Sequence, residues 1–286
     1  MAKWRGIGFM KDTITLPPNS THAVNTRGFA ALPDEIYLEI VSHIPSVTIP
    51  TLIHSESYPK IRRSRHETLL SLTQTSSSLR RFFWRYLWQR IEVREGMKSG
   101  DRDDSLRGTF VGASSKRYAT ELVRLLEVVT IRIPQLTQYV KWVLAFFYPT
   151  FLASSRSYVN SYLDIFIGEY SIETVLSELA RCLSLFPNLH TVQIDVITSC
   201  RQQVSFGEIF EQTFRNYSYP QIRNVFVMFF SVSFVASCPQ ARRLGFTRNY
   251  PMTKSCLQTI LGKCPHLEVL EGFGNLLSVP NACNRA

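Results

Sequence analysis

Two stretches near the N-terminus decide the fold: residues 29–44 read FAALPDEIYLEIVSHI, and residues 65–88 read RHETLLSLTQTSSSLRRFFWRYLW. In the first stretch isoleucine recurs every four residues, at positions 36, 40 and 44, so one face of a helix would be apolar. Pro33 suits the first helical position because its fixed φ is helical and its missing N–H would be unpaired there. Acidic residues at the next two positions match the positive end of the helix dipole. We therefore predict a helix over 33–44.

The second stretch predicts two further helices. Leucines at 69, 70 and 72 indicate a helix over 65–73, and the serines at 76–78 offer hydroxyl groups that cap the next one. That third helix runs to about residue 88, with apolar residues at i, i+3, i+4, i+7 and i+8: Leu79, Phe82, Phe83, Tyr86 and Leu87. Three short helices in about 60 residues cannot bury all their apolar faces against each other. We therefore expect an exposed apolar strip that marks a protein interface, made of Leu32, Ile36, Leu69, Leu79 and Trp88.

The order of these motifs resembles an F-box domain, most closely those of fungal F-box proteins. Leu-Pro-x-Glu-Ile at 32–36 opens a helix, a leucine-rich helix follows, and Thr-x-x-x-Leu-Arg at 75–80 leads to a closing Leu-Trp at 87–88. The resemblance implies a three-helix module that docks on the Skp-type adaptor of a cullin–RING ubiquitin ligase. It implies that eight residues lie in or support that contact: Leu32, Pro33, Ile36, Ile40, Leu69, Leu72, Leu79 and Trp88.

The sequence departs from the F-box family in one place. About twenty residues, 45–64, separate the first and second helices, where the family has a short turn. How this insertion affects adaptor docking is left open. The alternative interpretation of all three helices is an ordinary helical subdomain that packs on the rest of the chain.

A proline followed two residues later by Leu, Ile or Ala begins a pattern that repeats in the second half of the chain, and we call it the Pro-x-Leu pattern. Each copy places apolar residues at its third and sixth positions and predicts a short strand with one buried face, and the copies start at Pro187, Pro220, Pro239 and Pro265. The starts lie 33, 19 and 26 residues apart, which is close to the period of leucine-rich repeats. An earlier, degenerate copy is expected at Pro134, with Leu136 and Tyr139. The copies resemble the irregular leucine-rich repeats found behind many F-box modules; a non-repetitive α/β core is the alternative.

A helix is expected before each proline, for example over 171–185, and another over 117–130. One strand and one helix cannot bury a core alone, so neighbouring copies would stack into a short α/β solenoid. The expected organisation is a mixed α+β or α/β chain with a disordered leader at 1–28, an F-box domain at 29–93, a linker at 94–116 and a leucine-rich-repeat-like substrate-recognition domain at 117–286. Substrate would meet residues near the strands: Gln193, Asp195, Asn224, Arg243 and Glu268.

The net charge of +10 does not by itself indicate a nucleic-acid partner. Residues 1–93 hold 12 Lys/Arg against 7 Asp/Glu, and residues 94–286 hold 20 against 15, so no domain owns the excess. A basic cluster over 60–65 falls in the expected loop insertion. It reads as a solvated loop, with a polyanion-binding or nuclear-import patch as the alternative.

Catalytic and membrane signals are missing from the sequence. The six cysteines have no close C-x-x-C pair, the six histidines have no ligand spacing, and the apolar windows at 143–152 and 225–236 are too short to cross a membrane. No secretory signal is visible, which favours cytosol or nucleus. These absences favour a non-enzymatic, cofactor-free protein, and the resemblance to F-box proteins implies the substrate-recognition subunit of a Skp–cullin–F-box ligase. The alternatives are an F-box-fold scaffold outside a ligase and, third, an α/β hydrolase or transferase.

Overall fold

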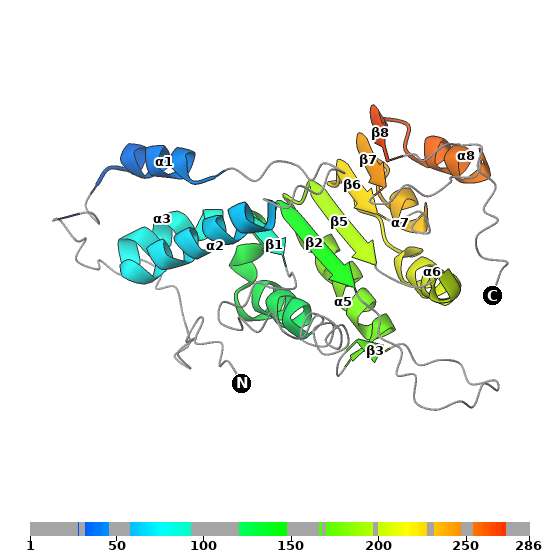
Figure 1. The fold of residues 1–286 in the computed structure, drawn as a ribbon, viewed down its shortest axis with the longest axis horizontal. Coiled ribbons are helices and arrows are strands. Elements are labelled where there is room, and N and C mark those ends of the chain that lie inside the picture. Colours follow the sequence, from blue (N-terminus) through cyan, green and yellow to red (C-terminus); the bar gives the residue numbers. More distant parts are fainter. Residues whose placement is uncertain are drawn as a thin grey trace.

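The computed structural model describes residues 28, 32–45, 58–92, 120–147, 166–167, 170–196, 200–227, 232–246 and 254–272 (Figure 1). The expected leader, apart from Gly28, and the expected linker 94–116 lie outside the described residues. The described chain combines helices with a parallel sheet, so the mixed fold class is confirmed at that level.

Three helices come first: α1 (Asp34–His43), α2 (Tyr58–Thr75) and α3 (Ser77–Leu87). Helix α3 begins where the serines predict, because the side chain of Ser76 accepts a hydrogen bond from the N–H of Leu79 (3.2 Å) and caps the first turn. Helix α2 begins earlier than expected. The basic cluster over 60–65 therefore lies on a helix, and the prediction of a loop there was wrong.

The three helices share a small apolar core of their own. Tyr37 from α1 packs against the rings of Phe82 and Phe83 from α3, with centroids 4.9 and 5.7 Å apart. Leu69 from α2 and Leu79 from α3 complete the core. At the junction of α2 and α3, the Nε of Arg80 donates to the carbonyl of Thr73 (3.0 Å). These contacts hold α1–α3 together as one packed unit.

Six strands form one parallel sheet, and every strand pairs with the next of these strands along the chain. Their order is β1 (Arg90–Glu92), β2 (Trp142–Phe147), β5 (Thr191–Val196), β6 (Asn224–Val227), β7 (Arg243–Phe246) and β8 (Val269–Glu271). A separate antiparallel pair joins β3 (Phe166–Ile167) to β4 (Tyr170–Ser171). Strand β1 follows α3 directly, so the sheet begins inside the segment 29–93.

Helical segments connect the strands and supply most of the main core. A helix over 120–127 continues into a π-helical turn (Val128–Arg132) and a 3₁₀ helix (Pro134–Tyr139) before β2. Four helices then precede or follow the later strands: α5 (Ile172–Ser184), α6 (Cys200–Phe214), α7 (Val232–Ala236) and α8 (Lys254–Lys263). Figure 1 shows α5 to α8 following one another along the sheet. Their apolar residues share one core with alternate strand residues such as Val192 and Ile194.

The Pro-x-Leu copies coincide with the structural units. In every copy the N–H two residues after the proline donates to the carbonyl before it, as in Leu189 to Phe186 (3.3 Å) and Ile222 to Tyr219 (3.2 Å). This turn ends each helix and leads into a strand. The strand pairing then puts the sixth position of each copy in one apolar column: Val192, Val225 and Leu244, which are buried, and Leu270, which is partly buried.

The degenerate copy at Pro134 is only partly as expected. Leu136 is buried and makes the same turn bond, to Ile133 (2.9 Å). The 3₁₀ helix delays the strand, however, and the residue that pairs with Val192 is Val143, not Tyr139. The assignment of Tyr139 to the strand was therefore wrong. The two apolar windows contain β2, β6 and α7, and within the described ranges no helix has the length and apolar character to span a membrane.

Candidate protein-binding surfaces

Helix α1 buries most of the face predicted for it, but with Tyr37 in the place expected for Ile36. Tyr37 and Ile44 lie at the centre of its buried side, with Ile40 and Val41 partly buried beside them. Ile36 is 44% exposed because the side chain of Tyr37 occupies the centre of the buried face. The prediction rested on the spacing of the isoleucines and did not take Tyr37 into account. Leu38, on the other margin of the helix, is 48% exposed.

Four of the eight residues expected to contact the adaptor lie on or beside one margin of α1. Pro33 and Ile36 are exposed, and Leu32 and Ile40 are partly buried against the three-helix core. Because Ile40 follows Ile36 by one helical turn, these residues share a side of the helix. We refer to Leu32, Pro33, Ile36 and Ile40 as the α1 margin.

The other four expected residues lie deeper. Leu72 is partly buried, whereas Leu69, Leu79 and Trp88 are only 2%, 3% and 6% exposed. Leu69 and Leu79 are covered by the three-helix core, and Trp88 belongs to the main core under the sheet. The prediction that these three form an exposed strip was therefore wrong. Leu69 and Leu79 share a core with Leu32 and Ile40 and so support the α1 margin from within, whereas Trp88 does not; all three offer little surface to a partner.

The polar strand residues expected to face a substrate alternate with core residues along β5, β6 and β7. Gln193, Asp195, Asn224 and Arg243 therefore lie on the face of the sheet opposite the apolar column. Several already have partners there. The Nε2 of Gln193 donates to Asp195 (2.6 Å), and the Nδ2 of Asn224 donates to the Oγ1 of Thr191 (3.0 Å).

Arg243 on the same face forms an ion pair with Glu271 (2.5 Å). Gln193 and Asp195 are buried, so this face is less accessible than the sequence suggested. Glu268 differs from the others because it precedes β8 and is exposed, with an ion pair to Arg242 (3.4 Å).

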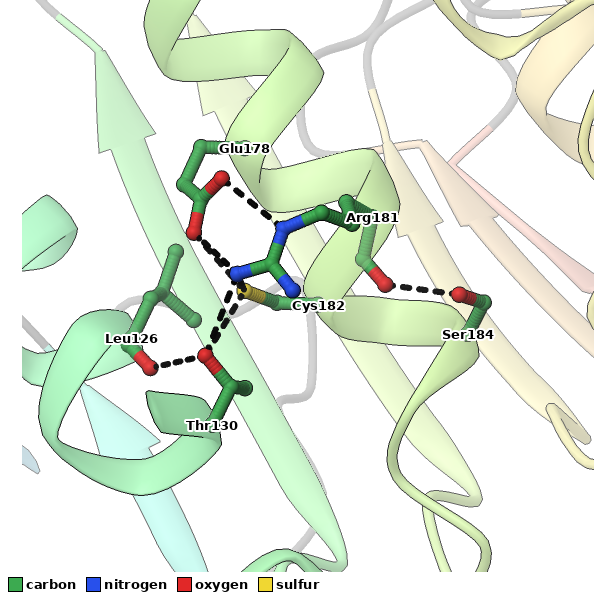
Figure 2. Close-up of polar contacts among 6 residues, drawn as sticks. All are labelled: Leu126, Thr130, Glu178, Arg181, Cys182 and Ser184. Carbon is green, nitrogen blue, oxygen red and sulfur yellow. Dashed lines mark hydrogen bonds and ion pairs between the residues drawn. The ribbon is translucent and has the colours of Figure 1, made fainter. Parts of the chain in front are cut away.

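A polar cluster joins α5 to the π-helical turn (Figure 2). The guanidinium of Arg181 binds Glu178 on its own helix and donates to the Oγ1 of Thr130 (3.2 Å), which in turn donates to the carbonyl of Leu126 (2.8 Å). The thiol of Cys182 lies beside them, 3.8 Å from the Oγ1 of Thr130. The cluster therefore ties two helical segments together across the edge of the core.

The same cluster is a poor nucleophilic site. Burial, reinforced by the charge of Glu178, raises the pKa of the Cys182 thiol to about 12, so it stays protonated at neutral pH. Glu178 is a weaker base than an ordinary carboxylate, because Arg181 holds the pKa of its carboxyl below its usual range. Among the described residues, no group of three or more His, Cys, Asp or Glu side chains could hold a metal ion.

Comparison of the sequence with models of known protein families and with curated proteins gave no match in either case. The interpretation of the surfaces therefore depends on their geometry. Two surfaces stand out in the described chain: the α1 margin and the edge of the sheet formed by the N-terminal ends of its strands.

Proposed function

We propose that this protein is the substrate-recognition subunit of a Skp–cullin–F-box type ubiquitin ligase. In this proposal α1–α3 form the F-box that docks a Skp-type adaptor, and the sheet with its helices forms a short leucine-rich-repeat-like solenoid that holds a protein substrate. The observation that carries the proposal is the α1 margin. It is a partly exposed apolar edge, on a helix whose opposite side is anchored by Tyr37 to α3.

The arrangement of the sheet supports the second half of the proposal. The strands pair strictly in chain order, so each contacts only its neighbours along the chain, and β5 to β8 each follow a Pro-x-Leu turn. A stack of this kind gains stability from each interface between neighbours and leaves long rows of equivalent positions for a partner. Strand β1 follows α3 after two residues, so the adaptor-binding helices and the repeat sheet would be rigidly connected.

The chemistry required of such a subunit is positioning. Holding a lysine-bearing substrate near the ubiquitin-loaded enzyme raises its effective concentration there, and no side chain of this chain has to react. This fits the protonated Cys182 thiol and the carboxylate of Glu178, which is engaged by Arg181.

The test is recovery of the tagged protein from cells in which the proteasome is blocked. The proposal predicts that a Skp-type adaptor and a cullin copurify, and that at least one copurifying protein accumulates when this chain is deleted. Recovery of the adaptor without cullin, with no accumulating protein, would favour the scaffold alternative. Ile36→Glu should abolish recovery of the adaptor. Leu38→Glu is the matched control, because it makes the same change at a similarly exposed position on the other margin of α1.

A further inference from the structure

Four basic residues lie in one row where the strands of the sheet begin. Each stands immediately before a strand: Lys141 before β2, His190 before β5, Arg223 before β6 and Arg242 before β7. We call these four residues the strand-start row. Each carbonyl in the row accepts hydrogen bonds from the next strand. The N–H of His190 donates to Lys141 (3.0 Å), that of Arg223 to His190 (3.0 Å) and that of Arg242 to Arg223 (2.7 Å).

The spacing of the row follows from this pairing. Neighbouring strands lie about 4.8 Å apart, so the backbone positions of Lys141 and Arg242, three strands apart, span roughly 14 Å. Lys141, Arg223 and Arg242 are exposed, and His190 is half-buried between the first two. The row lies along the edge of the sheet at which β2, β5, β6 and β7 begin, which is the upper edge of the sheet in Figure 1.

Lys141 and Arg223 both lie close enough to His190 for their charges to act on its imidazole. Burial lowers the pKa of its imidazole, and the charges of Lys141 and Arg223 lower it further. The imidazole is therefore neutral at pH 7 and adds no charge of its own to the row. No described residue forms an ion pair with Lys141 or Arg223, whereas Arg242 is paired with Glu268. Within the described chain these two positive charges are therefore unpaired, and their backbone positions lie about 10 Å apart, two strand spacings.

We propose that the strand-start row binds a short acidic segment of the protein substrate. In an extended peptide alternate side chains lie about 7 Å apart on one side, so three or four consecutive carboxylate-bearing residues match the distance between Lys141 and Arg223. The indole of Trp142 contacts the ring of His190 edge-on (5.8 Å between centroids) and offers an apolar surface beside the charges. That the acidic segment belongs to a substrate rests on the proposed function; the recognition of its charge by the row does not.

The surroundings of the row favour a short acidic peptide over a nucleic acid. Glu268 closes the row at the β8 end, because it stands immediately before β8 as the four basic residues stand before their own strands. A long polyanion that extended along the row past β7 would meet this carboxylate. A segment of a few residues would not.

The test is the binding of a fluorescein-labelled peptide with five consecutive glutamates to the purified full chain, measured by fluorescence anisotropy. The same peptide with glutamines is the ligand control. Lys141→Gln with Arg223→Gln should weaken binding of the glutamate peptide about 5- to 30-fold, as expected for two exposed ion pairs. Arg124→Gln with Lys254→Gln removes the same charge from exposed positions outside the row and should leave the affinity within about twofold.

The proposal is overturned if the glutamate and glutamine peptides bind alike, or if both double variants lose affinity equally, because net charge would then explain the binding. It is also overturned if a labelled 12-nucleotide oligothymidylate binds more tightly than the peptide and depends on the same two residues. The row variant should still copurify with the Skp-type adaptor. Loss of peptide binding with the adaptor retained would therefore separate this proposal from the proposed function.

Discussion

Gly245 in β7 provides the sharpest test of the strand pairing. It is paired with Phe226 of β6, on the face of the sheet opposite the apolar column. A Cβ atom at position 245 would lie 2.5 Å from the Cδ1 of Phe226 and 2.9 Å from its Cε1. The Phe226 ring is 1% exposed, and the guanidinium of Arg243 lies 5.7 Å from its centroid, so the ring has little room to move. Gly245→Ala therefore forces a shift inside a packed region.

The expected cost is that of overpacking, about 1–3 kcal/mol. In a chain of this size the melting temperature should fall by roughly 2–4 °C for each kcal/mol. Urea unfolding followed by tryptophan fluorescence measures the free energy directly. Gly262→Ala is the control, because no heavy atom lies within 4 Å of the Cβ it would add and it is in helix α8. That change should stabilise the protein by about 0.5–1 kcal/mol.

A double substitution completes this test. Phe226→Leu removes the ring, so in its presence Gly245→Ala should cost at least about 1 kcal/mol less than it does alone. If Gly245→Ala is neutral or stabilising in the natural background, Phe226 does not pack against Gly245, and the β6–β7 register is wrong.

Two further predictions concern local structure. Ser76→Ala removes the cap of α3 and should lower the free energy of unfolding by about 1 kcal/mol. Ser77→Ala, at the exposed first position of the helix, should change this free energy by much less. Equal effects of the two substitutions in urea unfolding would argue against the cap. The Cys182 thiol, with its pKa raised to about 12, should resist iodoacetamide at pH 8 in the folded protein and react in urea. Peptide mass mapping measures this reactivity, and fast labelling of folded Cys182 would contradict its burial.

The parts of the fold that follow from neighbouring residues could be predicted from the sequence. Helix α3 matches its prediction because the cap at Ser76 and the spacing of Leu79, Phe82 and Phe83 are local signals. The later strands match as well, because a proline ends each helix and apolar residues alternate after it. The start of α2 was missed because residues 58–64 show no apolar period, although Ser57 and Pro59 are residue types that favour a helix start there.

The parts that depend on distant partners could not be predicted. The buried face of α1 is centred on Tyr37 because Phe82 and Phe83, 45 residues later, receive its ring. Trp88 follows the end of the third helix as expected, but it is buried in the main core. The residues next to it in the sequence do not indicate this burial.

The strand-start row shows the same limit at the candidate surface. Lys141 and Arg242 are separated by 101 positions, and the row exists only because the strands pair in chain order. The sequence showed the basic residues but not that they become neighbours. Conversely, Gln193 and Asp195 were expected to be accessible, and their mutual hydrogen bond was visible only in the structure.

The central claim is that the α1 margin docks a Skp-type adaptor. The most direct measurement is the affinity of the purified chain for a purified Skp-type adaptor by isothermal titration calorimetry, with Ile36→Glu and Leu38→Glu compared side by side. Burying an unpaired carboxylate in the contact should cost at least about 2 kcal/mol, so Ile36→Glu should weaken binding about 30-fold or more, and Leu38→Glu by less than about threefold. Absence of binding by the unmodified chain, or equal affinities for all three proteins, would contradict the account.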